Sequence, residues 1–183
     1  MKVLFFIESL QSGGKERRII ELLKGLKDLK DVQCELVLTR EEIHYEEVYQ
    51  LSIPIHIIKR RFIKKDPLLF FKFYTLVKKV KPDIIHVWGH MVAVYLVPTK
   101  WLLRIPLLNS EITDATPNQK LLGKSIVFNA SDKIIANTKA GLDAYQAPSS
   151  KGGVIYNGFN FSRLESLQSE QSIRDKFSLK TPY

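Results

Sequence analysis

A glycine pair, Gly13-Gly14, separates an apolar run from a basic amphipathic run near the start of the chain. Residues 2–8 are typical of a buried strand, and the residues from Lys15 onward have helical spacing. Glycines at a helix start let a ligand approach backbone N–H groups, which carry the positive end of the helix dipole. The pattern predicts a site for a phosphate or another anion, unless the glycines serve only a tight turn.

Four histidines are the other candidates for chemistry. His86 and His90 are four residues apart but straddle a strand end and a turn, and no carboxylate set or Cys34 completes a metal-ligand spacing. The residues after Gly14 do not continue as G-x-G-x-x-G, and the sequence has neither a P-loop nor a G-x-S-x-G elbow. These absences argue against dehydrogenases, nucleoside triphosphatases and serine hydrolases.

The composition bounds the fold and the location. The chain has 183 residues, 45% of them hydrophobic, which is enough for one well-buried domain and short for two. A single cysteine, Cys34, excludes an internal disulfide framework and predicts a reducing, cytoplasmic location. We expect neither a secretory leader nor a membrane span, because no window of about 18 uncharged apolar residues occurs.

Most of the net charge of +9 lies in residues 59–81, which carry nine basic residues and one acid, Asp66. The same segment is rich in phenylalanine. Cations and aromatic rings together suit an anionic membrane surface, and a peripheral contact of this kind is one prediction. The alternative is an ordinary helix with solvated lysines and a phenylalanine core. No recognition motif for nucleic acid occurs, so we expect no nucleic-acid partner. The residues expected to face the membrane are Lys64, Lys65, Lys72, Lys78 and Lys79.

Strands and helices alternate along the chain. This order predicts a Rossmann-like three-layer α/β/α sandwich with a mostly parallel sheet of about seven strands. We expect strands at 2–8, 32–39, 53–59, 83–88, 105–109, 133–137 and 154–156, and helices at 14–29, 67–81, 90–103, 119–130 and 138–146. We interpret residues 40–51 as a loop with a short helix, residues 110–118 as a polar loop, and the chain after 160 as polar and weakly structured.

Ligands of such sheets bind at the carboxyl ends of the strands. The residues that follow the predicted strands are therefore the candidates for a site, and they are Gly13, Gly14, Trp88, Gly89, His90, Glu111, Thr113, Asp114, Asn137, Thr138 and Asn157.

Four segments together resemble the N-terminal domain of family 4 glycosyltransferases, which are retaining enzymes built from two facing Rossmann-like domains (the GT-B fold). Each segment ends or follows a predicted strand, and their order matches the family across about 160 residues. The segments are Ser12-Gly13-Gly14-Lys15-Glu16, the run from Pro82 to His90, the run from Ser131 to Lys139, and Val154-Ile155-Tyr156-Asn157-Gly158-Phe159-Asn160.

The resemblance implies roles for the first two segments. Gly13, Gly14 and Lys15 would face the cleft near the donor diphosphate and the acceptor. The family usually carries a histidine near the sugar, in a His-x-His pattern that here becomes His86-Val87-Trp88. Either Trp88 replaces the cleft histidine, or its role passes to His90, which follows Gly89. We expect His90 to be the catalytic residue, unless it is only the first residue of a helix, and His86 to be a core histidine.

The resemblance also implies roles for residues later in the chain. Asn137 and Thr138 match a loop of the family that carries an Asn-Ser or Asn-Thr pair, and they would contact substrate or cap a helix. Glu111 and Thr113 complete the expected substrate-binding set. Asn157-Gly158 would begin the crossover to a second domain and act as a hinge, unless it is a simple turn.

A second departure from the family concerns the donor. The family holds the nucleotide mostly in a C-terminal domain, and the sequence ends about where that domain would begin. We therefore expect residues 1–160 to be the acceptor-side domain and 161–183 to start the linker, with the donor-binding domain absent. This chain alone should transfer little or no sugar.

The complete enzyme implied by the resemblance would move a hexose from a nucleotide-sugar to an acceptor hydroxyl with retention of configuration. Its partners would be the nucleotide-sugar and a glycan or lipid-linked acceptor of the cell envelope. We expect no metal and no other cofactor, since no Asp-x-Asp occurs and the family usually works without one. The alternatives are a non-catalytic flavodoxin-like binding or regulatory domain, a basic nucleic-acid module, and another two-domain transferase or sugar-nucleotide epimerase.

Overall fold

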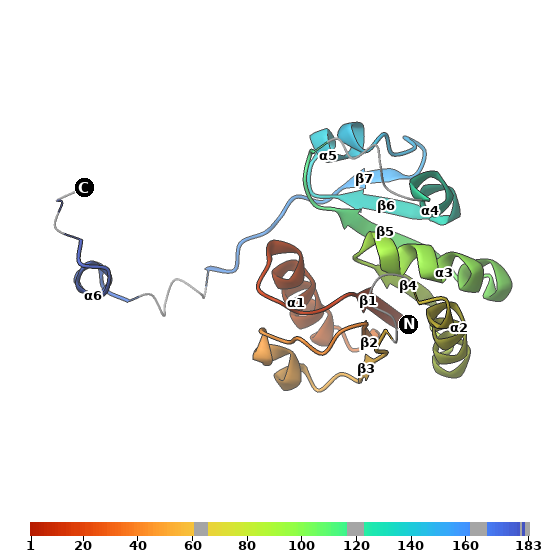
Figure 1. Cartoon of the computed structure of the whole chain (residues 1–183), viewed down its shortest axis with the longest axis horizontal. Coiled ribbons are helices and arrows are strands. Elements are labelled where there is room, and N and C mark those ends of the chain that lie inside the picture. Colours follow the sequence, from red (N-terminus) through yellow and green to blue (C-terminus); the bar gives the residue numbers. More distant parts are fainter. Residues whose placement is uncertain (61–65, 117–122, 162–167, 180, 182–183) are drawn as a thin grey trace.

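The computed structural model describes residues 1–60, 66–116, 123–161, 168–179 and 181, and Lys64 and Lys65 lie outside this described part. Seven strands form one sheet in the order β3-β2-β1-β4-β5-β6-β7, and every adjacent pair is parallel (Figure 1). This confirms the predicted fold class. The strands are β1 (Lys2–Ile7), β2 (Gln33–Leu38), β3 (Ile55–Ile57), β4 (Ile84–Val87), β5 (Leu107–Ile112), β6 (Lys133–Ala136) and β7 (Gly152–Val154).

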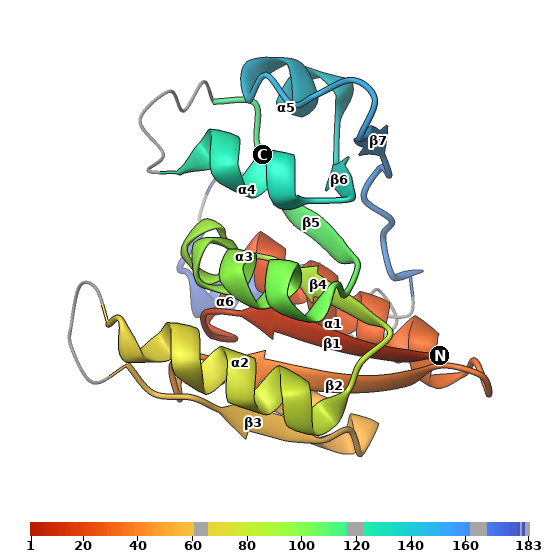
Figure 2. The same cartoon turned by 90° about the vertical axis from the view of Figure 1, so that its right-hand side faces the viewer.

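Helices cover the two faces of the sheet unequally. Figure 2 shows α2 (Leu68–Val80), α3 (His90–Leu103) and α4 (Lys124–Ala130) in front of the sheet, and α5 (Lys139–Ala144) adds side chains to the same core. The opposite face packs against α1 (Gly14–Lys27) and the 3-10 helix η1 (Glu46–Leu51). Side chains of these two elements pack in one core with those of β1, β2 and β3. The part of this face that β4, β5 and β6 form is less covered by them.

The central strand β1 is buried on both faces because helices cover it from both sides. Leu4 and Phe6 point into the core under α2 and α3, while Phe5 and Ile7 point into the core under α1. Each such side chain contributes about 1.5–3 kcal/mol of burial free energy. This continuous apolar strand places its last residue, and therefore the loop with the glycine pair, at a fixed edge of the sheet.

The aromatic helix α2 shows how the basic segment is organised. Leu69, Phe73 and Val77 form a fully buried stripe at a spacing of four residues, whereas Phe70 and Phe71 are exposed, so the expected phenylalanine core of this helix holds for Phe73 only. The side chain of Asp66 accepts a hydrogen bond from the Leu68 N–H at 3.0 Å and so supports the start of the helix. The helix ends at Lys81, whose φ of 51° is left-handed. The stripe faces α3, and the lysines of the last turn face outward.

Three expectations about the elements were wrong. Ser110 and Glu111 belong to strand β5, although they were expected in a polar loop, because their side chains find polar partners inside the fold. Strand β7 is Gly152–Val154, shifted from 154–156, since pairing with β6 outweighs the weak strand preference of glycine. Helix α6 (Glu170–Lys176) forms in the polar tail, where the Ser169 hydroxyl accepts from the Ser172 N–H at 3.2 Å.

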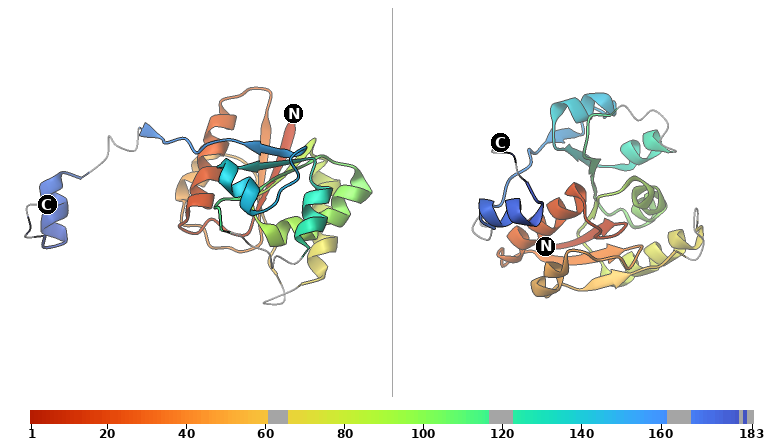
Figure 3. Two further views of the ribbon diagram at one scale, coloured as in Figure 1. Left: turned by 90° about the horizontal axis from the view of Figure 1, so that it is seen from above. Right: turned by 60° about the vertical axis from the view of Figure 1, so that its left-hand side comes forward.

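The chain leaves the sheet after β7. Residues 155–161 run along the face that α1 covers in part, and α6 stands apart from the sheet (Figure 3). The Asn160 side-chain amide donates to Glu21 Oε2 on α1 at 3.0 Å. None of the helices in the described part has the length and apolar character that crossing a membrane requires.

Candidate functional site

The order of the strands places a crevice between two of them. The chain moves outward from β1 through β2 to β3, then returns to pair β4 with the other side of β1. In such sheets the connections after these two strands diverge to opposite faces, which opens a binding crevice at their carboxyl ends. The loop after β1 carries Gly13-Gly14, and the turn after β4 carries Trp88-Gly89. The fold therefore brings together two of the predicted segments.

The glycine loop is held in position from the far side by residues that follow β2. The Tyr45 hydroxyl accepts from the Gly13 N–H at 3.1 Å and donates to the Gly13 carbonyl at 3.0 Å. The Ser12 N–H donates to His44 Nδ1 at 3.2 Å. Gly13 is the N-cap of α1 in an extended conformation, and Gly14 is the first helical residue. The first turn of α1 is thus fixed and turned toward the crevice.

The helix start opens into a pocket of about 320 Å3. Its lining combines residues from four distant parts of the sequence, namely Gly14, Lys15, Arg18, Thr113, Asn137, Asn157 and Gly158. Four of them, Gly14, Thr113, Asn137 and Asn157, were predicted from strand ends. A Cβ added at Gly14 would meet no atom within 4 Å, so the glycine leaves open space beside the backbone. The pocket can therefore admit an anion to the N–H groups at the helix start.

A carboxylate stands between the two halves of the crevice. Glu8 follows β1, and its Oε2 pairs with Lys15 Nζ at 3.0 Å. A Cβ on Gly89 would collide with the Glu8 carboxylate, so the glycine lets this carboxylate approach the backbone, and a larger residue would displace it. Gly89 is the N-cap of α3, so Glu8 lies near the positive end of that helix. Lys15 consequently has a carboxylate partner next to the predicted anion pocket.

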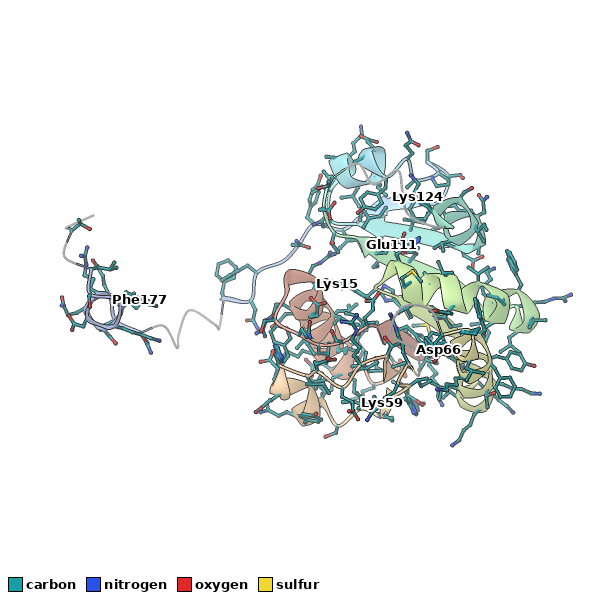
Figure 4. All side chains as sticks on the ribbon, viewed as in Figure 1. Lys15, Lys59, Asp66, Glu111, Lys124 and Phe177 are labelled. Carbon is teal, nitrogen blue, oxygen red and sulfur yellow. The ribbon has the colours of Figure 1, made fainter. Side chains whose placement is uncertain are left out.

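His90 lies at the start of α3 beside a second carboxylate. Its Nδ1 is 3.2 Å from both Glu111 Oε1 and Oε2. The Glu111 side chain is 2% exposed, and the Glu111 N–H donates to the Asn109 side chain at 2.9 Å. Figure 4 labels Lys15 on helix α1 and Glu111 on strand β5. A buried carboxylate beside one ring nitrogen orients the imidazole.

Asn137 and Thr138 have different contacts. The Asn137 side-chain N–H donates to the Thr113 carbonyl at 2.9 Å, and its Oδ1 is buried without a hydrogen-bond partner among the described residues. Asn137 also lines the pocket at the start of α1, so this oxygen is a candidate acceptor for a ligand there. The Thr138 hydroxyl accepts from the Gly141 N–H at 3.0 Å and caps α5. Ligand contact by Thr138 stays a prediction.

A second pocket, of about 410 Å3, lies on the open half of the α1 face. One side chain from each of β4, β5 and β6 forms its floor. These are His86, Ser110 and Ile135, and Trp88 lies beside them. Its walls come from α1 and from residues 155–160. The two pockets share Arg18, Asn157 and Gly158. Asn157 and Gly158 thus border both cavities, while their function as a hinge stays a prediction.

His86 is a core histidine, as expected. Its Nε2 is 2.8 Å from the Ser110 hydroxyl oxygen, and its ring packs 5.1 Å from the Phe5 ring. Burial lowers the pKa of His86 to about 3, and the nearby charge of Arg18 adds to this effect. His86 is therefore neutral across the physiological range. Trp88 is also buried, at 3% exposure, so it contributes its edge to the pocket and most of its ring to the core.

Sequence reasoning missed three residues at the crevice. Arg18 lines both pockets, Glu8 pairs with Lys15, and Tyr45 holds Gly13, but they were assigned only to a helix surface, a strand end and a loop, respectively. The position of Glu8 directly after a buried strand was a usable signal. The position of Tyr45 had none, because its contact with Gly13 joins residues 32 apart in sequence.

The predicted membrane-facing lysines can be placed in part. Lys78 and Lys79 are exposed on the last turn of α2, and Lys72 donates to the Lys59 carbonyl at 3.1 Å. Phe71, on the same side of the helix, is 69% exposed. A cavity of about 570 Å3 lies between β3 and α2, with Phe71, Lys72 and Lys79 in its lining. Lysines and an exposed ring therefore occur together on this surface.

Residues 12–163 match the family model described as Glycosyltransferase Family 4. The chain belongs to this family. The matched range contains the glycine pair, both pockets and the His90–Glu111 pair, so the whole candidate site lies in the part of the chain that matches the family.

Solved structures of family-like architecture have the same fold. The chain is similar to HepE of Anabaena in complex with UDP and glucose, with a TM-score of 0.76 and 22% identity over 97% of this chain and 50% of that chain. It is similar to a glycosyltransferase from Rickettsia africae (TM-score 0.73, 20% identity, 99% of this chain and 50% of that chain). It is also similar to the lipopolysaccharide outer core galactosyltransferase WaaB (TM-score 0.70, 15% identity, 88% of this chain and 47% of that chain).

The solved structures are longer than this chain. This chain spans about half the length of each of the three solved structures. No protein with a curated description matches the sequence. Within the described residues, no three His, Cys, Asp or Glu side chains gather in a way that could hold a metal ion. The metal-independent reaction expected from the sequence stays a prediction.

Proposed function

We propose that this family 4 chain is the acceptor-side domain of an enzyme that transfers a hexose from a nucleotide-sugar to an acceptor hydroxyl, with retention of configuration. The observation that carries the proposal is the pocket at the start of α1, where Gly14 and Lys15 meet Asn137 and Asn157. The similarity to HepE, solved with UDP and glucose, supports the nucleotide-sugar as donor. The donor's second contact surface would belong to a following domain, with residues 161–183 as the linker.

The reaction needs a group that stabilises the departing diphosphate. The N–H groups at the start of α1 are in place before the charge develops, which is the condition for electrostatic catalysis. Lys15 adds a cation, and its pairing with Glu8 at 3.0 Å keeps it at the edge of the pocket. On arrival of a diphosphate, Lys15 would exchange part of its contact with Glu8 for the phosphate oxygens.

His90 would act on the sugar side of the same crevice. Glu111 holds the imidazole through Nδ1, so the ring presents a defined edge to a sugar hydroxyl. Such a hydrogen bond aligns the sugar and strengthens as positive charge develops at its anomeric carbon. His90→Ala should lower kcat of the complete enzyme by about 10²-fold or more, while His90→Gln should retain part of the activity.

The glycine position allows a sharper test. Gly14→Ala adds a methyl group where no atom lies within 4 Å, so folding should be preserved while an anion is kept from the backbone. Gly25→Ala is the matched control, since it also adds a methyl group into open space on α1 but lines neither pocket. The assay is transfer by the full-length protein across a panel of UDP- and GDP-sugars. Equal rates for both variants would contradict the proposal, as would rapid transfer by the 183-residue chain alone.

We also propose that the acceptor is lipid-linked or part of the cell envelope and that α2 contacts the membrane. Phe71 offers an exposed ring, and Lys72, Lys78 and Lys79 offer charges of about 1 kcal/mol each at an anionic surface. The triple change of these lysines to glutamate should release the protein from anionic liposomes in co-sedimentation. The control changes Lys30, Lys133 and Lys139, which are exposed on other surfaces, to glutamate. Equal release by both sets would refute a specific role for α2.

A further inference from the structure

Arg18 is a cation whose charge the described structure does not neutralise. Its Nη1 is buried and has no hydrogen-bond partner, and no ion pair joins it to a carboxylate of the described residues. Its neighbour Arg17 differs, because it pairs with Glu47 and lies 3.6 Å from Glu21. Arg18 as a whole is partly exposed, but its buried Nη1 lacks a partner in the described part of the chain, which costs free energy unless a ligand supplies an acceptor. An anionic group bound beside Arg18 would supply one.

The surroundings of Arg18 show where that anion would lie. The guanidinium carbon is 5.3 Å from the centre of the Trp88 ring, which holds it by a cation–π contact. The guanidinium lines the 410 Å3 pocket together with Ser110 and the amide side chains of Asn157 and Asn160. The buried Trp88 Nε1 is a second donor without a partner among the described residues. Two unused donors thus belong to side chains of one cavity.

The rest of the cavity is suited to a sugar. Its volume lies within the range of pockets that hold small organic ligands. Ile155, Tyr156 and Phe159 supply apolar surface for the faces of a ring, and Ser110 and Asn157 supply polar groups. The Glu21 carboxylate also lines the cavity, but it already accepts from Asn160 and pairs with Arg17 and Lys24. Gly14 and Lys15 do not line this cavity, because they belong to the neighbouring pocket. The 410 Å3 cavity is therefore adjacent to the proposed diphosphate pocket, and Arg18 lines both.

We propose that this cavity binds an acidic sugar of the acceptor, whose carboxylate or phosphate pairs with Arg18. This inference rests on the proposed function, since it names the substrate class of the same crevice. A sugar held here would lie beside the pocket at the start of α1, with Arg18 at the boundary of the two. Neutral sugars would leave the guanidinium without a counter-ion and would bind more weakly.

The test measures binding of defined sugars to the 183-residue chain. The chain has two tryptophans, so Trp101→Phe leaves Trp88 as the only indole reporter at the cavity. In this background, glucuronate, galacturonate and glucose 6-phosphate are titrated against glucose and galactose at constant ionic strength. We expect at least one acid to bind about tenfold or more tightly than its neutral counterpart, as a charge-assisted hydrogen bond provides.

Variants of the two neighbouring arginines then assign the effect. Arg18→Gln should abolish the preference for acids, and Arg18→Lys should retain part of it. Arg17→Gln removes the same charge from the same cavity wall, but Arg17 already has carboxylate partners, so the preference should change less than about threefold. Circular dichroism checks that each variant folds, and Arg18→Lys keeps the test valid if Arg18→Gln does not fold.

The outcomes separate this inference from the proposed function. Equal binding of acidic and neutral sugars, or an acid preference that survives in Arg18→Gln, overturns the inference. An Arg18-dependent preference for pyrophosphate or UDP over every sugar acid also overturns it and assigns Arg18 to the donor. Arg18-dependent binding of a sugar acid without transfer by the full-length protein would leave the site intact and refute the transferase function. Transfer to neutral acceptors that Arg18→Gln leaves unaffected would support the transferase function and refute the role of Arg18.

Discussion

The buried imidazole of His86 should make the stability of this protein fall steeply in mild acid. In the folded chain its pKa is about 3, because burial and then the Arg18 charge disfavour the imidazolium. In the unfolded chain it should titrate near the ordinary value of about 6.5. The unfolded state therefore binds more protons between these two values, and stability is lost as the pH falls through this window.

The magnitude follows from the unfolded pKa. At pH 5.0 the unfolded histidine is about 1.5 pH units below its pKa, so its protonation favours unfolding by about 2 kcal/mol. This figure holds for any folded pKa well below 5, so it depends little on how far His86 is shifted. In Arg18→Gln most of the effect should remain, because burial is the larger cause of the shift.

The assay is urea unfolding followed by circular dichroism at pH 7.5 and pH 5.0. Wild type should lose about 2 kcal/mol more than His86→Gln between the two conditions, since every other titrating group cancels in the comparison. An NMR titration of the His86 ring provides a check that needs no variant. Equal losses in the two proteins, or a His86 midpoint above about pH 5, would refute the role of burial.

Three substitutions test the elements that position the site. Gly25→Ala should raise the free energy of unfolding by roughly 0.5–1 kcal/mol, because Gly25 lies in α1 with open space at its Cβ; a loss of stability in denaturant would show that space to be occupied. Gly89→Ala should displace Glu8 and break its pair with Lys15, so the double variant with Glu8→Ala should recover stability in a double-mutant cycle, and purely additive effects would argue against the contact. Thr138→Ala should cost about 1 kcal/mol by removing the α5 cap, with Thr138→Ser close to wild type; an unchanged melting temperature would argue against the cap.

The pattern of the sequence was sufficient to predict the architecture. Alternating apolar and amphipathic runs predicted a parallel sheet, because strands covered on both faces need continuous apolar residues and each connection needs a helix. Because all strands of a parallel sheet end at the same edge, the residues that follow the strands lie together at that edge. This is why Gly14, Thr113, Asn137 and Asn157, from four distant segments, could be selected from the sequence and line one pocket.

The sequence alone determined the strand-and-helix order, the positions of the turns and the glycine pair that begins α1. Only the tertiary structure decided which polar side chains face each other. Ser110 and Glu111 were expected in a loop, yet they lie in β5, because His86 and His90 supply their partners from the neighbouring strand and helix. The free energy of such a buried pair depends on two residues more than 20 positions apart in the chain, and local propensity contains no information about that distance.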